Sequence, residues 1–169
     1  MLLQLKDEVI SLSPEQVQLS GLLTEIHQTD RPVQLGSEIP DGILRQVVWF
    51  LQNAQSKTIF EPLAQIARAA MQRDGMRTVS GFMEPPERAV FGSWIDSRSL
   101  DEVMDLCKAA AYLDIVPLCD LASCALAVHI SKMRPEEMRA KFQIEPQYAN
   151  NSMQRFDALM NASAQCKHE

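Results

Sequence analysis

The feature that most constrains the fold is a pair of apolar helical patterns that meet at a sharp break. Ser99 and Glu102 have the spacing of a capping box, in which each side chain accepts a hydrogen bond from the other residue's backbone. Apolar residues then recur at helical spacing for several turns. Asp114 and Pro117 interrupt the pattern, and an inward stripe resumes at Leu118. The sequence therefore predicts two helices joined by a tight corner.

The first residues predict two strands and a helix. The opening LLQLKDEVISLS favours two short strands around a turn at residues 6–8. Ser13 and Gln16 then have capping-box spacing, and Pro14 suits the first helical position. We expect one helix from this point through residue 28.

A third strand and a central helix follow. The stretch PVQLGSEIP, residues 32–40, predicts a strand and a loop, and residues 41–55 predict a helix capped by Asp41. Apolar residues cover more than one face of this helix, which indicates a central position. The order of elements is typical of an α+β fold that is mostly helical with a small N-terminal sheet.

The middle of the chain has the weakest pattern. Residues 59–73 have helical spacing, whereas 73–88 are rich in glycine and proline and predict a loop. We therefore expect 56–92 to be a divergent insertion or loop. The predicted domains are 1–128, which contains this stretch, and a C-terminal helical extension at 129–169.

Composition excludes several classes of function. The formal net charge is −6 and no Lys/Arg-rich run alternates with aromatic residues, which argues against nucleic-acid binding. Apolar runs fall short of the ~20 residues that span a bilayer, so no membrane segment is expected. The start MLLQLKDEVI fits neither a signal nor a transit peptide, which predicts a cytoplasmic or nuclear protein.

The reactive residue types form no catalytic or metal-binding pattern. The four cysteines show no CxxC pair and are expected to be reduced thiols. Cys119, Cys124 and His129 are five residues apart, so neighbours on one helix would point ~140° apart and could not converge on a metal. No nucleophile elbow, phosphate-binding loop or HExxH motif is present. We expect no enzyme activity, no metal and no cofactor.

The stretch MRPEEMRAKFQI, residues 133–144, contains two adjacent carboxylates. Pro135 suits the first position of a helix, which places Glu136 and Glu137 in the first turn, where the helix dipole favours negative charge. Adjacent residues on a helix point ~100° apart, so the two carboxylates do not face each other as an acid and a base would. The pair is predicted to be structural.

Two stretches carry a resemblance to a known family. In order and without gaps, AAYLDIVPLCDLA and MRPEEMRAKFQIEP resemble the C-terminal half of the Skp-one family, the S-phase kinase-associated adaptors of SCF ubiquitin ligases. The matching residues are Tyr112, Leu113, Asp114, Ile115, Leu118, Asp120, Pro135, Glu136, Glu137, Arg139, Phe142 and Ile144. A weaker resemblance covers the first strands and helices but leaves out 56–92. Taken together, the resemblance implies a BTB/POZ-like α+β domain with added C-terminal helices of the F-box-binding type, without cofactor or catalysis.

The resemblance also implies two binding surfaces, because the family bridges an F-box protein to a cullin in a ubiquitin ligase. Contact with an F-box-type partner is expected from Leu113, Leu118, Leu121, Pro135, Met138, Phe142, Ile144, Tyr148 and Phe156. Contact with a cullin-type partner is expected from Ala111 and Tyr112. The C-terminal residues are rich in methionine and aromatic side chains, which adapt to a partner helix.

Departures from the family pattern keep other functions open. Ala111 stands where the family has an asparagine, and Arg134 stands where it has a threonine N-cap, which predicts a looser helix start. The tail lacks the family's acidic run and final tryptophan. The first alternative is a Skp-like structural scaffold subunit in a non-ligase assembly. A weaker alternative is a BTB-like homodimer.

Overall fold

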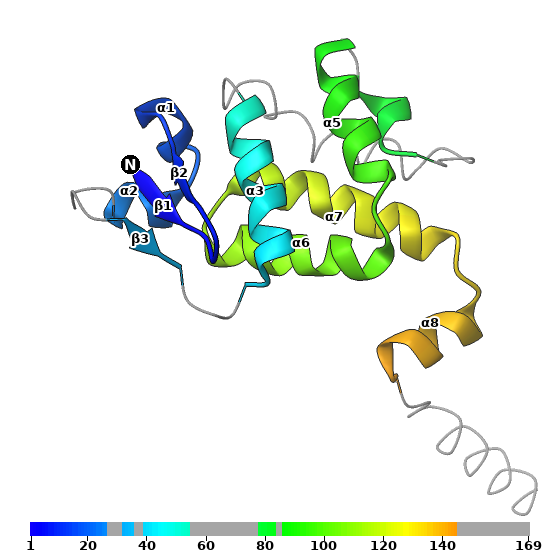
Figure 1. Cartoon of the computed structure of the whole chain (residues 1–169). Coiled ribbons are helices and arrows are strands. Elements are labelled where there is room, and N and C mark those ends of the chain that lie inside the picture. Colours follow the sequence, from blue (N-terminus) through cyan, green and yellow to red (C-terminus); the bar gives the residue numbers. More distant parts are fainter. Residues whose placement is uncertain (27–31, 36–38, 55–77, 84–85, 145–169) are drawn as a thin grey trace, which may run out of the picture. The chain divides into compact units, whose positions relative to one another are not determined.

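The computed structural model describes residues 1–26, 32–35, 39–54, 78–83 and 86–144, which Figure 1 draws in colour. Within these ranges the protein is mostly helical and has a small three-stranded sheet near the N-terminus, so the α+β class is confirmed. The chain divides into two compact units, Met1–Lys132 and Met133–Glu169. The boundary lies after the end of a long helix, whereas we expected it inside that helix at residue 128.

The sheet contains the three predicted strands. Strand β1 (Leu2–Gln4) pairs antiparallel with β2 (Val9–Ser11) and parallel with β3 (Val33–Gln34), which gives the order β2-β1-β3. Leu3 of the central strand is fully buried, whereas its neighbour Leu2 is exposed. This alternation places one face of the sheet against the hydrophobic core.

The helix expected from residue 13 to residue 28 is broken in two, and this prediction was wrong. The capping box of Ser13 and Gln16 does begin α1 (Pro14–Val17), but a second helix, α2 (Gly21–Ile26), starts separately. Ser20 separates them because its hydroxyl donates to the carbonyl oxygen of Leu113 at 2.5 Å and accepts from the Leu23 amide at 3.1 Å. A contact with a distant part of the chain therefore decides the break.

Helix α3 (Asp41–Asn53) is central, as predicted. Its buried residues lie on more than one side and are Ile43, Leu44, Val47, Val48, Phe50 and Leu51. The expected cap was wrong by one residue, because Pro40 is the N-cap and its carbonyl accepts from the Ile43 amide at 2.9 Å. Asp41 is instead the first helical residue, where a carboxylate still suits the helix dipole.

Part of the stretch expected to be a loop or insertion belongs to the core. It contains a short 3-10 helix, η2 (Ser80–Phe82), and a full helix, α5 (Pro86–Asp96). Val79, Met83 and Phe91 are buried. The loop prediction is therefore wrong for 78–83 and 86–92, and the expected helical segment at 59–73 lies outside the described residues.

Asp96 fixes the start of η2 to the end of α5. Its carboxylate accepts hydrogen bonds from the backbone amides of Val79 at 2.7 Å and Ser80 at 2.9 Å. Both bonds are charge-assisted, and the amide of Val79 belongs to a residue that is 1% exposed. This carboxylate clamp joins two segments that sequence patterns had left unconnected.

Asp96→Asn should lower the free energy of unfolding by about 1–2 kcal/mol. The single side-chain oxygen of asparagine can accept a hydrogen bond from one of the two amides. Its NH2 group would then face the other amide N–H, from which it cannot accept. Urea denaturation followed by circular dichroism measures the change. Asp41→Asn is the matched control, since the structure gives Asp41 no such clamp. Equal stability of Asp96→Asn and wild type would contradict the clamp.

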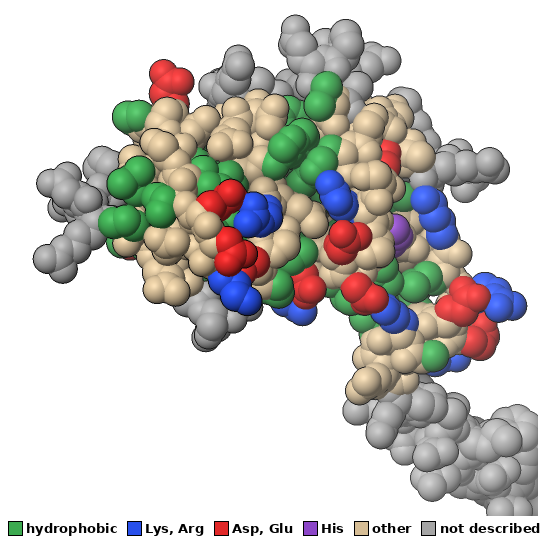
Figure 2. Space-filling model, in the orientation of Figure 1, with side chains coloured by type: hydrophobic (Ala, Val, Ile, Leu, Met, Phe, Trp, Pro, Cys, Tyr) green, Lys and Arg blue, Asp and Glu red, His purple; other side chains and the backbone are tan. Residues whose placement is uncertain are grey.

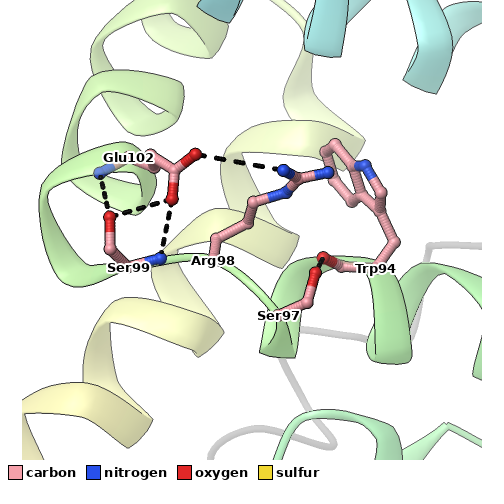
Figure 3. A network of polar contacts seen from close by, with 5 residues as sticks. All are labelled: Trp94, Ser97, Arg98, Ser99 and Glu102. Atoms are coloured by element: carbon pink, nitrogen blue, oxygen red, sulfur yellow. Dashed lines mark hydrogen bonds and ion pairs between the residues drawn. The ribbon is translucent and has the colours of Figure 1, made fainter.

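The turn between α5 and α6 (Leu100–Tyr112) is held by the network in Figure 3. Ser99 and Glu102 form the predicted capping box, with the Ser99 amide donating to Glu102 at 2.9 Å. These bonds from Ser99 hold the pKa of the Glu102 carboxyl below its usual value. The predicted capping box is therefore confirmed. Beside it, the guanidinium of Arg98 lies 5.5 Å from the centre of the Trp94 ring and 3.9 Å from Glu102.

Helices α6 and α7 (Val116–Ser131) form the predicted helical pair and lie side by side, with α3 packed across α6 (Figure 1). The corner between them is tight because Asp114 adopts a left-handed conformation with φ 52°. The Ile115 amide closes the corner by donating to the carbonyl oxygen of Ala110 at 2.9 Å. Two backbone amides of α2 also bond to this corner. The Gly21 amide donates to the carbonyl oxygen of Asp114 at 3.0 Å, and the Leu22 amide donates to that of Leu113 at 3.4 Å.

Candidate partner-binding sites

A hollow of about 360 Å³ lies beside Tyr112 at the end of α6. Its lining residues come from α6 and from the segment that leads into α3, and they are Ile39, Pro40, Asp105, Lys108, Ala109 and Tyr112. The Tyr112 side chain is 48% exposed, which is high for a large aromatic residue. The hollow therefore combines an apolar wall with an aromatic side chain that a partner can reach.

The polar part of this hollow is an ion pair. The Lys108 ammonium lies 2.9 Å from the Asp105 carboxylate, and this hydrogen bond raises the pKa of Lys108 above its usual value. Figure 2 shows acidic and basic side chains interspersed over the face where α3 and α6 lie. The hollow thus has both signs of charge beside its apolar wall.

Both residues expected to contact a cullin-type partner are exposed. Ala111 and Tyr112 are adjacent near the end of α6, but only Tyr112 lines the hollow. The sequence did not reveal Ile39 and Pro40 as lining residues, because no local pattern links them to α6. Their proximity arises from the packing of α3 on α6.

A second candidate site is the outward side of α7, which we call the α7 face. It consists of the exposed and half-buried residues Val116, Cys119, Asp120, Ser123, Leu126, Ala127 and Ile130, of which Cys119 and Leu126 lie at its edge and also pack against the core. Val116 is 60% exposed. These positions follow the three- and four-residue spacing of one side of a helix. A helix side that faces water normally carries charges, whereas this one carries mainly apolar side chains and one carboxylate.

Three of the expected F-box-type contact residues lie in the core, and their burial does not fit the assignment to a binding surface. Leu113, Leu118 and Leu121 are at most 1% exposed. Leu118 and Leu121 lie on the side of α7 opposite to the α7 face, and Leu113 is buried under the corner. Their side chains cannot reach a partner without unfolding of this region.

Six of the expected contact residues belong to the second unit, and the structure describes four of them. Helix α8 (Pro135–Phe142) begins at Pro135 as predicted, and Pro135 is exposed. Met138 and Phe142 are half-buried and lie one turn apart on one side of α8. Ile144, just after the helix, is 52% exposed. Tyr148 and Phe156 lie outside the described residues.

The adjacent carboxylates of α8 have the structural role that the sequence predicts. Glu137 accepts from the Arg134 amide at 2.9 Å and pairs with the Arg134 guanidinium at 2.9 Å. These hydrogen bonds hold the pKa of Glu137 below its usual value. Arg134 has no side-chain acceptor, so Glu137 supplies the only working half of the capping box. Whether the helix start is looser than with threonine stays a prediction.

The described cysteines are free thiols. Cys107 and Cys119 are half-buried and Cys124 is buried, while Cys166 lies outside the described residues. Burial raises the pKa of Cys107, and burial with the Asp120 carboxylate raises that of Cys124 to about 11. Among the described residues, no group of three or more His, Cys, Asp or Glu is placed to hold a metal ion.

Cys124 should react slowly with iodoacetamide in the folded protein. At pH 8.5 the unfolded thiol is about half ionised, whereas a folded pKa of about 11 leaves little thiolate. We expect alkylation at least about tenfold slower than in urea, measured by mass spectrometry. Because the pKa of Cys124 is higher in the folded protein, the unfolded thiol ionises first as the pH rises. The contribution of this thiol to the free energy of unfolding is therefore full below the unfolded pKa and is lost as the pH rises toward 11. Equal alkylation rates would contradict the buried, neutral thiol.

A comparison of the chain with protein-family models finds no match, and no curated protein matches it. Within the part of the chain that the structure describes, no helix is both long and apolar enough to cross a membrane. For the Tyr112 hollow and the α7 face, the indications of a partner are therefore their own chemistry and the resemblance in the sequence.

Proposed function

We propose that this protein is a non-catalytic adaptor of the Skp-one type, built on a BTB/POZ-like domain. In this role it joins an F-box-type helical protein to a cullin-type scaffold and so serves a ubiquitin ligase. The F-box-type partner binds the α7 face, and the apolar residues of α8 are a separate candidate contact within the second unit. The Tyr112 hollow binds the cullin-type partner.

The α7 face is the observation that carries this proposal. Covering apolar side chains such as Val116, Ala127 and Ile130 removes them from water, which favours binding by roughly 25 cal/mol per Å² of apolar surface. A helical partner suits a helical surface because its own apolar side chains recur with the same spacing. An apolar side on a surface helix thus favours a protein partner over a small polar ligand.

The corner after α6 is a second support. The resemblance includes Tyr112, Leu113 and Asp114, and each has a distinct place at this corner. Leu113 is buried, Asp114 provides the left-handed turn, and Tyr112 is left exposed beside the hollow. A motif whose buried residues fix the corner and whose aromatic residue faces outward fits a binding domain better than an active site.

One observation favours the alternative, a Skp-like scaffold subunit in a non-ligase assembly. Ala111 is exposed next to Tyr112, at the position where the family has an asparagine. A methyl group cannot replace the amide as a hydrogen-bond donor or acceptor. Loss of that group weakens the case for a cullin-type partner while leaving the α7 face unchanged.

Affinity purification of the tagged full-length protein from its native cells tests the proposal. We expect wild type to recover F-box proteins and a cullin. Ala127→Glu, which puts a charge in the α7 face, should lose the F-box proteins, and Tyr112→Ala should lose the cullin. Val90→Glu is the matched control, because Val90 is 56% exposed on α5 and is not a residue of either site.

The outcomes separate the two functions. Recovery of stable partners without a cullin, still sensitive to Ala127→Glu, would favour the scaffold. An identical set of partners with wild type and Ala127→Glu would contradict the α7 face as a binding surface. Circular dichroism of each variant shows that it is folded.

A further inference from the structure

Asp120 is the one charged side chain of the α7 face, whose other members are apolar apart from Ser123. It is half-buried and makes no hydrogen bond or ion pair with any residue that the structure describes. Burial raises the pKa of its carboxyl above the usual value. The side chain therefore bears a desolvation cost before any partner is bound.

The surroundings of Asp120 within its unit do not offset this cost. Among the residues that the structure describes, the group that interacts with its charge is the Cys124 thiol, which is neutral at physiological pH. Lys108 is occupied by Asp105 at 2.9 Å. Asp120 also lies beyond the first turn of α7, where the helix dipole no longer favours a carboxylate.

A partner that covers the α7 face increases the desolvation cost of the Asp120 carboxylate unless it brings a positive charge. Removing the remaining water from an unpaired carboxylate is costly, whereas a cation placed at hydrogen-bond distance compensates for it. Neighbours Val116, Ser123 and Ala127 are small or apolar and offer no charge. The compensating group must come from the bound molecule.

We infer that the partner of the α7 face is a helix whose apolar side carries one lysine or arginine, and that this residue pairs with Asp120. This inference rests on the proposed function and adds the chemistry by which the partner is selected. An apolar helix without a correctly placed cation would leave the carboxylate buried and unpaired, so Asp120 rejects such helices. Asp120 is thus a specificity-determining residue.

The test uses the proteins that tagged full-length wild type captures from a lysate of native cells. Their retention by Asp120→Asn, Asp120→Lys and Asp120→Glu is quantified by mass spectrometry across a salt gradient. We expect retention to fall at least about tenfold in Asp120→Asn, to vanish in Asp120→Lys and to persist in part in Asp120→Glu. Asp7→Asn is the matched control, because Asp7 is an exposed carboxylate in the turn between β1 and β2 and belongs to neither candidate site.

A charge exchange then identifies the pair. Changing the partner's basic residue to glutamate should restore binding to Asp120→Lys and weaken binding to wild type. A purely structural role for Asp120 is separated by stability, because Asp120→Asn removes a desolvated carboxylate and should be at least as stable as wild type. A less stable Asp120→Asn with unchanged binding would overturn the inference.

The result also distinguishes this inference from the proposed function. If Ala127→Glu loses the partners while Asp120→Asn retains them as wild type does, the α7 face binds a partner but Asp120 does not select it. If neither variant changes the partners, both proposals fail. Loss of the same proteins with Ala127→Glu, Asp120→Asn and Asp120→Lys supports both.

Discussion

Leu118→Ala should lower the free energy of unfolding by about 2–5 kcal/mol, the range for removing a buried leucine side chain. Leu118 is 0% exposed, in the first turn of α7, where the helix meets the rest of the core. Alanine would leave a cavity that rigid neighbouring helices fill only in part. Urea denaturation followed by circular dichroism measures the loss.

Cys119→Ala is the matched control for this change. Cys119 is the next residue along the chain but lies on the α7 face, and it is only half-buried. We expect its loss to cost well under half as much as that of Leu118. If Leu118→Ala kept full stability and lost only its partner, Leu118 would belong to a binding surface, as the resemblance implies. That result would contradict the burial of its side chain in the core.

The two kinds of variant separate stability from binding. Partner loss in Leu118→Ala should follow the fraction of unfolded protein and recover when the temperature is lowered. Partner loss in Ala127→Glu should persist in a fully folded protein. The comparison therefore tests whether the inward and outward sides of α7 have the separate roles that the structure gives them.

Elements that depend on local chemistry could be predicted from the sequence. The capping boxes at Ser13 and Ser99, the start of α8 at Pro135 and the corner at Asp114 all form where expected. Each rests on hydrogen bonds or backbone restrictions within a few residues. Such signals hold because no distant contact competes with them.

The errors arise where a distant contact decides the structure. Ser20 interrupts a helix because its hydroxyl bonds to Leu113, which lies far along the chain. Pro86 was interpreted as a loop residue, although proline is also typical of a first helical position, which it occupies in α5. Neither outcome can be chosen from the local sequence alone.

The main error at the candidate site came from the resemblance. The spacing of apolar residues in α7 predicts an inward stripe that begins at Leu118, and this stripe is confirmed, because Leu118 and Leu121 are buried. The resemblance placed both residues on a binding surface, which their burial does not fit. Tyr112, in contrast, could be chosen correctly as an exposed residue, although its partner stays a proposal.

The same packing argument predicts that Gly92→Ala is strongly destabilising. A Cβ atom at Gly92 would lie 2.6 Å from the Ser80 Cα atom and 2.9 Å from the Ser80 nitrogen. Both distances are far below van der Waals contact and involve backbone atoms, which cannot rotate away. We expect a loss of about 3 kcal/mol or more, the upper end of the range for overpacking. Chemical denaturation measures it.

Gly42→Ala is the matched control, because a Cβ atom at Gly42 meets nothing within 4 Å. Gly42 lies in the first turn of α3, so alanine there should be neutral or should stabilise the protein by about 0.5–1 kcal/mol. Opposite effects of one added methyl group would establish that α5 packs on η2 at backbone contact. If Gly92→Ala were as stable as Gly42→Ala, that contact would be absent, and the segment around η2 would be the peripheral loop that its glycines and prolines suggest.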